Sequence, residues 1–146
     1  MRYESYPIKA DASSLRFEFF SQGPKGKIRK QVMFHQTKNL EIFNLAFGDV
    51  DIITGEINDI VVTDNKDTHK VLSTVALTIY KFFEKYPDYY VAATGSTASR
   101  TRLYQIGIVK NLEEIEKDFQ LFGFISDEWE EFKKGKNYEA FLIKKL

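Results

Sequence analysis

The hydrophobic period of the chain changes near residue 64, and this change constrains the fold more than any other feature. Before that point apolar and polar residues alternate, as in residues 15–20 and 28–35. After it, Val71, Val75 and Phe82 recur at helical spacing. Alternation is typical of half-buried strands, and a 3.6-residue period is typical of an amphipathic helix. The sequence therefore predicts an α+β fold in which strands come first.

The early strands are predicted to form an antiparallel meander, because the connections between them are short. Turn residues at 22–27 join the strands at 15–20 and 28–35 into a hairpin. Two more strands are predicted at 42–47 and 59–63.

A crossover follows the meander. Asp64 or Asn65 is predicted to cap a helix that Pro87 ends near residue 86. Residues 89–93 then form a continuous apolar strand of the kind that is buried on both faces. One helix joins this strand to the fourth strand, so the two strands are predicted to run parallel in an otherwise antiparallel sheet.

The remaining residues add a second main helix and the last strands. Ser96 or Thr97 is predicted to cap this helix, whose apolar face extends to residue 119 and is interrupted at Gly107. The final elements are predicted as a strand at 121–125, a short helix at 126–132 and a strand at 138–143. Residues 1–146 are thus expected to form one α+β domain with a mixed, mostly antiparallel sheet and two main helices.

Composition excludes several classes of function. The chain contains no cysteine, which excludes disulfides, thiolate metal ligands and a cysteine nucleophile. Its two histidines, His35 and His69, argue against a His-rich zinc site. The 21 basic and 21 acidic residues cancel, which disfavours bulk nucleic-acid binding by phosphate neutralisation. No apolar run approaches a membrane span and no signal-peptide core is present, so a cytoplasmic protein is expected.

The candidate functional site lies in residues 91–104. This stretch is predicted to be a buried strand, a turn of glycine and hydroxyl residues, and a helix start that carries two arginines and a tyrosine. Backbone amides emerge without partners at a helix start, and cations there oppose the helix dipole, so a bound anion would compensate them. The predicted ligand-binding residues are Thr94, Gly95, Ser96, Thr97, Arg100, Arg102 and His69, and Tyr104 is the candidate catalytic residue.

A second interpretation of these residues is open at the level of the sequence. The hydroxyl residues can simply cap the helix while the arginines pair with acidic neighbours. His69 is either an acid or base, or a solvated residue on a helix surface. A basic patch on the first hairpin, which either contacts nucleic acid or protects an edge strand, comprises Lys25, Lys27, Arg29 and Lys30. The aromatic residues predicted to belong to the core or to a dimer surface are Trp129, Phe132, Tyr138 and Phe141.

The order of elements is similar to that of the GNAT acyltransferases. Leu103 and Tyr104, followed by Gly107, resemble a motif in the second helix of that family. The resemblance implies acetyl-CoA as a cofactor and Tyr104 as the acid that protonates the leaving thiolate. The loop that would hold the coenzyme pyrophosphate corresponds to residues 63–70, which contain no glycine and two acidic residues. Carboxylates at that loop oppose a bound pyrophosphate.

Three other stretches, residues 70–75, 93–104 and 137–141, resemble a family of short bacterial proteins described as a domain of unknown function. This resemblance would cover nearly the whole chain and implies no activity. A place beside defence genes in related members implies a protein partner. Three functions are therefore kept: a small anionic-ligand site in a GNAT-like shell, an interaction component of a defence or toxin–antitoxin operon, and an acyl-CoA-dependent N-acyltransferase.

Overall fold

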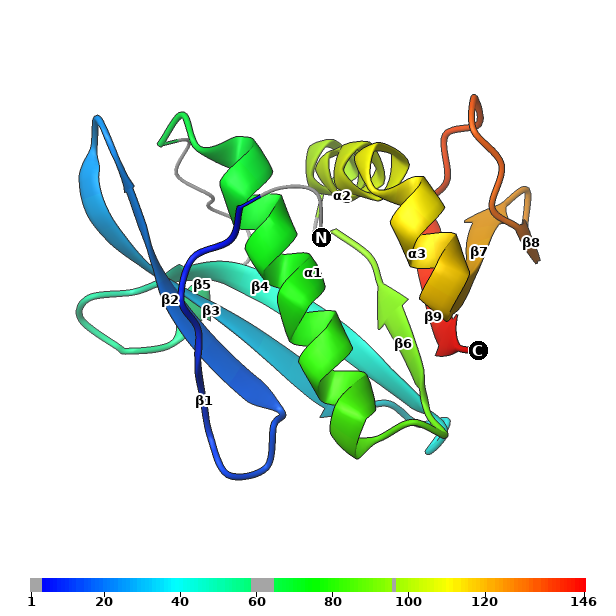
Figure 1. Cartoon of the computed structure of the whole chain (residues 1–146), viewed down its shortest axis with the longest axis horizontal. Coiled ribbons are helices and arrows are strands. Elements are labelled where there is room, and N and C mark those ends of the chain that lie inside the picture. The colour runs from blue at the N-terminus through cyan, green and yellow to red at the C-terminus, as the bar shows by residue number, and fades with distance from the viewer. Residues whose placement is uncertain (1–3, 59–64, 96) are drawn as a thin grey trace.

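The computed structural model describes residues 4–58, 65–95 and 97–146, and its strands form one mixed sheet in the order β1-β2-β3-β4-β6-β9-β7-β8, with β5 paired to β4 (Figure 1). The elements in chain order are β1 (Lys9–Ala10), β2 (Arg16–Gly23), β3 (Gly26–Gln36), β4 (Ile42–Val50), β5 (Ile57–Asn58), α1 (Thr68–Lys85), β6 (Tyr90–Ala93), α2 (Ala98–Lys110), α3 (Leu112–Asp118), β7 (Phe119–Ile125), β8 (Glu128–Glu131) and β9 (Ala140–Lys145). The predicted α+β domain with a mixed sheet is confirmed.

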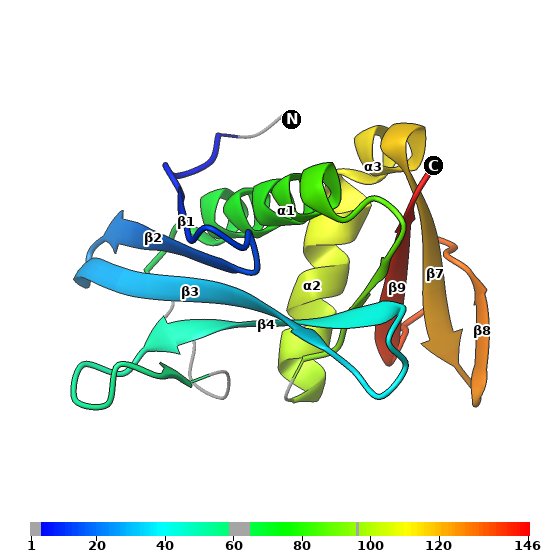
Figure 2. The same ribbon diagram turned by 90° about the horizontal axis from the view of Figure 1, so that it is seen from below.

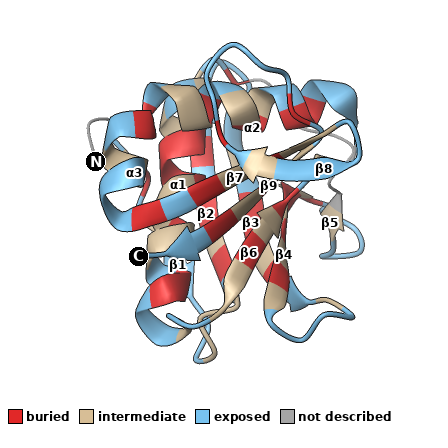
Figure 3. Ribbon diagram, turned by 90° about the vertical axis from the view of Figure 1, so that its right-hand side faces the viewer, coloured by how far each residue is buried: buried red, intermediate tan, exposed pale blue. Residues whose placement is uncertain are grey.

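The predicted meander is confirmed for β2, β3 and β4. Phe17 lies opposite Val32, and Val32 lies opposite Phe47, so one row of buried side chains crosses all three strands. Cross-strand pairs of aromatic and β-branched residues stabilise a sheet in this way. Buried and intermediate positions alternate along the first four residues of β9, as expected for a strand with one face in the core (Figure 3).

Helix α1 lies over the meander (Figure 2). The ring of Phe82 stacks on Phe34 with 4.6 Å between the ring centroids and meets Phe43 edge-on at 5.2 Å. These contacts explain why a helix with apolar residues every three to four positions forms at this place in the chain. At the other end of α1, the carboxylate of the N-cap residue Asp67 accepts a hydrogen bond from the Ser21 hydroxyl of β2.

The start of α1 differs from the prediction. Asp67, rather than Asn65, occupies the N-cap position, and its side chain makes no capping hydrogen bond. The Asn65 side chain donates to the carbonyl oxygen of Gly26 and accepts from the amide of Lys25, so it secures the hairpin instead of the helix. Asp64 and the strand predicted at 59–63 lie outside the described residues.

The predicted parallel pairing of the strand at 89–93 is found, but β6 pairs with β4, the third predicted strand, whereas the fourth, at 59–63, lies outside the described residues. The pairing runs from Ile42 opposite Tyr90 to Leu45 opposite Ala93. Strand β6 ends there, whereas β4 continues to Val50. The carbonyl groups of β4 beyond Leu45 therefore need partners other than β6 on that side.

Helix α2 continues through Gly107 and ends at Lys110, so the glycine that interrupts its apolar face does not break the helix. The break comes at Asn111, whose side chain donates to the carbonyl oxygen of Gly107 at 2.9 Å. Glu113 and Glu114 follow in the first turn of α3, where carboxylates favour a helix start.

The prediction of a short helix at 126–132 is wrong. Ser126 and Asp127 adopt positive φ angles of 52° and 61° and turn the chain into strand β8, which pairs with β7. The Trp129 ring packs on Phe124 across this pair, with 5.1 Å between centroids. Cross-strand packing thus outweighs a sequence that also suits a helix cap. Within the described ranges, no helix combines the length and apolar character that crossing a bilayer requires.

Candidate functional site

The turn between β6 and α2 is held by hydroxyl groups, as the sequence predicts. The Thr97 side chain accepts a hydrogen bond from the amide of Arg100 at 3.2 Å and so caps α2. The amide of Gly95 donates to the Thr101 hydroxyl at 3.0 Å. A side chain at position 95 would collide with the backbone of Thr101, so this close approach requires glycine. Ser96 lies outside the described residues.

Arg100 points into the molecule. Its residue is 6% exposed, and its guanidinium donates to the carbonyl oxygen of Phe47 in β4, past the end of the β4–β6 pairing. The same terminal nitrogen donates to the Tyr104 hydroxyl at 3.3 Å. The guanidinium carbon also lies 5.4 Å from the centre of the Phe47 ring, within the range of a cation–π contact. Arg100 therefore donates a hydrogen bond to β4 at a point that the pairing with β6 does not reach.

The other face of Arg100 borders a cleft of about 260 Å³, which we call the cation cleft. Its lining residues are Lys30, Phe47, Asn65, Asp67, Thr68, Val71, Leu72, Ser99, Arg100 and Leu103. They come from β3, β4, the segment before α1, and the first turns of α1 and α2. Two cations, Lys30 and Arg100, thus meet two helix starts at one place.

The charges around the cation cleft are fixed by contacts within the protein. Lys30 is 1% exposed, and its ammonium group lies 2.5 Å from a carboxylate oxygen of Asp49. One Asp67 carboxylate oxygen accepts from the hydroxyl groups of Tyr6 and Ser21, each at 2.5 Å. Burial, and then the hydrogen bond to Asp67, raise the pKa of Tyr6. Tyr6 therefore keeps its proton and remains a donor to this carboxylate.

The ends of the elements give the cation cleft its polarity. Thr68 begins α1 and Ser99 lies in the first turn of α2, and both residues line the cleft. A helix start presents backbone amides and the positive end of the helix dipole. Because the Asp67 side chain does not cap α1, it does not occupy the first-turn amides. The arrangement suits a small negative group.

The predicted ligand residues do not all face this cleft. A second hollow of about 400 Å³, the outer hollow, lies on the opposite side of the helix start. It is lined by Thr94, Gly95, Thr97, Ala98, Thr101, Arg102, Gln105, Asn137, Tyr138 and Glu139. Arg100 and Arg102 therefore line different spaces, as expected for residues two apart on a helix.

His69 lies away from both spaces in the described structure. One of its ring nitrogens lies 2.9 Å from the ammonium nitrogen of Lys110, which joins the start of α1 to the end of α2. Neither the cation cleft nor the outer hollow includes His69 among its lining residues.

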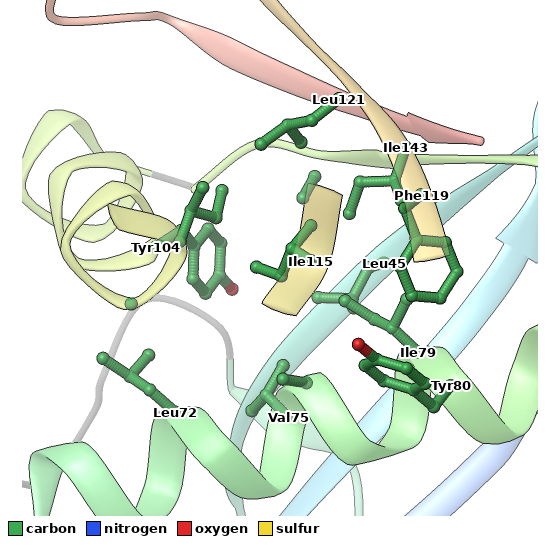
Figure 4. Close-up of a pocket in the computed structure, with 14 residues that line it drawn as sticks. Leu45, Leu72, Val75, Ile79, Tyr80, Tyr104, Ile115, Phe119, Leu121 and Ile143 are labelled. Atoms are coloured by element: carbon green, nitrogen blue, oxygen red, sulfur yellow. The ribbon is translucent and has the colours of Figure 1, made fainter. Parts of the chain in front are cut away.

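Tyr104 faces an apolar cavity of about 70 Å³ beneath the helices (Figure 4). Leu72 and Val75 of α1, Ile115 of α3 and Ile143 of β9 are among the side chains that surround it. Side chains that line unfilled space lose the dispersion contacts that a filled core would give them. The cavity is a weakness in an otherwise densely packed aromatic core.

Two lining residues of the cation cleft carry little signal in the sequence. Lys30 belongs to the predicted basic patch, but it is buried against Asp49, whereas Lys25, Lys27 and Arg29 are exposed. Asn65 suits a helix cap and instead secures a hairpin. Both residues reach the site through long-range contacts, which local patterns do not encode. Among the described residues, no cluster of three or more histidine or carboxylate side chains could hold a metal ion.

A protein-family model described as a family of unknown function (DUF6934) covers residues 2–146. No curated protein and no solved structure matches the chain.

Proposed function

The chain belongs to a family of unknown function (DUF6934), and we propose that it binds a small anionic ligand in the cation cleft. The ligand carries a phosphate or carboxylate group, which the starts of α1 and α2 hold together with Arg100. The observation that carries this proposal is the meeting of two helix starts and the buried Arg100 at one cleft. The charge of the second buried cation, Lys30, is already balanced by Asp49.

Two further features support a small ligand rather than a polymer. The cleft volume of about 260 Å³ is close to the lower end of the range for small-molecule sites, about 300 to 1,000 Å³. The formal net charge of the chain is zero, whereas nucleic-acid binding draws on an excess of basic residues. Recognition by Arg100 and backbone amides requires only one negative group.

The proposal is tested by titrating the protein with inorganic phosphate and with pyrophosphate while amide NMR signals are followed. We expect the signals of Thr68, Ser99 and Arg100 to move together with one dissociation constant. Ser99 is exposed and lines the cation cleft, so Ser99→Glu adds a repelling charge without disturbing the core. We expect this variant to bind at least about tenfold more weakly, a loss of about 1.4 kcal/mol.

The matched control is Ala98→Glu. Ala98 is also exposed in the first turn of α2, but it lines the outer hollow. This variant should bind pyrophosphate nearly as the unchanged protein does. An equal loss of pyrophosphate affinity in both variants would show that the anion is not bound specifically in the cation cleft. A loss of affinity in Ala98→Glu alone would place the site in the outer hollow beside Arg102. Failure of both anions to bind at millimolar concentration would overturn the proposal.

A second candidate is an acyl-CoA-dependent N-acyltransferase with GNAT-like topology. It is supported by the order of a meander, a crossover helix, a parallel strand and a second helix, and by the position of Tyr104 beside Arg100. Calorimetry with acetyl-CoA tests it directly. Absence of heat at millimolar acetyl-CoA would remove this candidate and leave the anion site standing.

A further inference from the structure

We propose that the ligand of the cation cleft carries a short aliphatic chain, which enters the apolar cavity behind the cleft. This inference rests on the proposed function, because it names the other end of the same ligand. The cavity then holds the aliphatic chain of the ligand and limits its length; we call it the tail compartment.

The cleft and the cavity are neighbours. Leu72 lines both of them. Arg100 lines the cleft, Tyr104 lines the cavity, and the guanidinium donates to the Tyr104 hydroxyl at 3.3 Å. The side chains of Leu72 and Tyr104 therefore separate an anionic group at Arg100 from the cavity, and the tail of the ligand reaches the cavity past Leu72.

The walls of the cavity suit an alkyl group and not water. Apart from the hydroxyl groups of Tyr80 and Tyr104, the lining side chains carry no polar atom. The Tyr80 hydroxyl donates to Asp118, and the Tyr104 hydroxyl accepts from Arg100. A buried water needs two to four polar partners, and dry apolar cavities instead accept small apolar molecules.

Small residues create the space. Ala76 of α1, Ala93 of β6 and Gly107 of α2 all line the cavity. Glycine inside a helix is unfavourable compared with alanine, so Gly107 keeps space open at the expense of stability. An engineered cavity of about 150 Å³ accepts benzene, and the volume here is about 70 Å³. A chain of two or three carbons is the size that fits.

The experiment measures dissociation constants for inorganic phosphate and for methyl, ethyl, propyl, butyl and hexyl phosphate by NMR titration. Each methylene that enters the cavity should tighten binding about fourfold. We expect this gain from methyl to propyl phosphate and none beyond butyl phosphate, because the space is then filled.

A cavity-filling variant tests where the chain lies. Ala76→Val should keep the affinity for inorganic phosphate and abolish the gain with chain length. The matched control is Ala92→Val, because Ala92 alternates with the core-facing residues Val91 and Ala93 and lies outside the cavity lining. This control should keep the gain in affinity with chain length. Thermal unfolding of both variants verifies that they fold.

The outcomes separate this inference from the function on which it rests. Binding of phosphate with an affinity independent of chain length would overturn the tail compartment alone. An affinity that rises steadily to hexyl phosphate would also overturn it, because a space of about 70 Å³ cannot hold a six-carbon chain. Failure of every phosphate to bind would overturn the anion site itself. A chain-length gain that survives Ala76→Val would place the alkyl group elsewhere.

Discussion

Arg100 connects three parts of the molecule through one side chain. It leaves α2, donates to the backbone of β4, and contacts the rings of Phe47 and Tyr104. Replacement by alanine would leave the carbonyl oxygen of Phe47 buried without this donor. Hydrogen bonds to charged groups contribute about 1.5 to 3 kcal/mol, and an unsatisfied buried acceptor adds to the loss. We therefore expect Arg100→Ala to lower the free energy of unfolding by about 2 to 4 kcal/mol in urea denaturation.

Arg102 provides the control for this prediction. It lies two residues away on the same helix, it is exposed, and it borders the outer hollow. Arg102→Ala should change the free energy of unfolding by less than about 0.5 kcal/mol, as surface substitutions usually do. Similar losses in both variants would show that helix α2, and not the internal contacts of Arg100, accounts for the effect.

Tyr80 makes the stability of the protein depend on alkaline pH. Burial, followed by repulsion from Asp118, raises the pKa of Tyr80 to about 12. The folded state therefore keeps the phenol proton at a pH where the unfolded chain, with a pKa near 10, loses it. The stabilisation from the raised pKa is fully present below about pH 10 and is lost as the pH rises towards 12.

The measurement is guanidinium denaturation of the unchanged protein and of Tyr80→Phe between pH 9 and 12. Phenylalanine keeps the ring against Phe119, whose centroid lies 4.8 Å from that of Tyr80, and removes the ionisable group. The variant should lose less stability with rising pH. Some decline should remain, because burial also raises the pKa of Tyr6 and of Tyr138. Parallel pH curves for the two proteins would contradict the assignment to Tyr80.

At the scale of the elements, Gly107 weakens α2 without breaking it. A methyl group at this position would lie 3.2 Å from a terminal carbon of Leu72 and 3.3 Å from its Cβ. The end of Leu72 borders the apolar cavity and has room to move into it, whereas its Cβ needs a shift of α1 by a few tenths of an ångström. We expect Gly107→Ala to raise the free energy of unfolding, but by less than the difference of about 1 kcal/mol between alanine and glycine in a helix. Thermal and urea unfolding measure this gain.

Gly95 offers the opposite case for comparison. A methyl group there would meet the backbone of Thr101, which cannot move aside as a side chain does. Gly95→Ala should therefore destabilise the protein. A loss of stability in Gly107→Ala as well would mean that Leu72 is fixed in place and that the cavity does not relieve the contact.

The element boundaries show what local sequence patterns can and cannot predict. The meander, α1, β6 and the Thr97 cap follow from periodicity and capping chemistry, which act within a few residues. The β7–β8 hairpin was not predictable in this way. Residues 126–129 suit a helix cap, but the Trp129–Phe124 contact and the Tyr138 hydroxyl, which donates to Glu130 at 2.8 Å, favour a strand.

The same distinction applies to the candidate site. Helical spacing predicts that Arg100 and Tyr104 share a face and that Arg102 does not, and the contacts confirm both. Lys30 and Asn65 reach the cation cleft only through the packing of the hairpin against α1. The binding roles of all these residues stay predictions until a ligand is titrated.

At the scale of the whole molecule, the sheet consists of two antiparallel parts joined by one parallel pair. Helix α1 lies over the part made of β1, β2, β3 and β4. Helix α3 lies beside the part made of β6, β9, β7 and β8 (Figure 2). The cation cleft lies where the joined strands end and the helices begin. Ligand sites in sheets with parallel strands commonly occupy such a position, beyond the carboxyl ends of the strands.

The position of β9 has a consequence for folding. Strand β9 lies between β6 and β7, although it follows both of them in the chain. Until residues 140–145 pair, β6 and β7 each present an open edge. Open edges pair readily with other chains. A partly folded molecule in which β9 has not yet inserted is therefore the state most prone to aggregation.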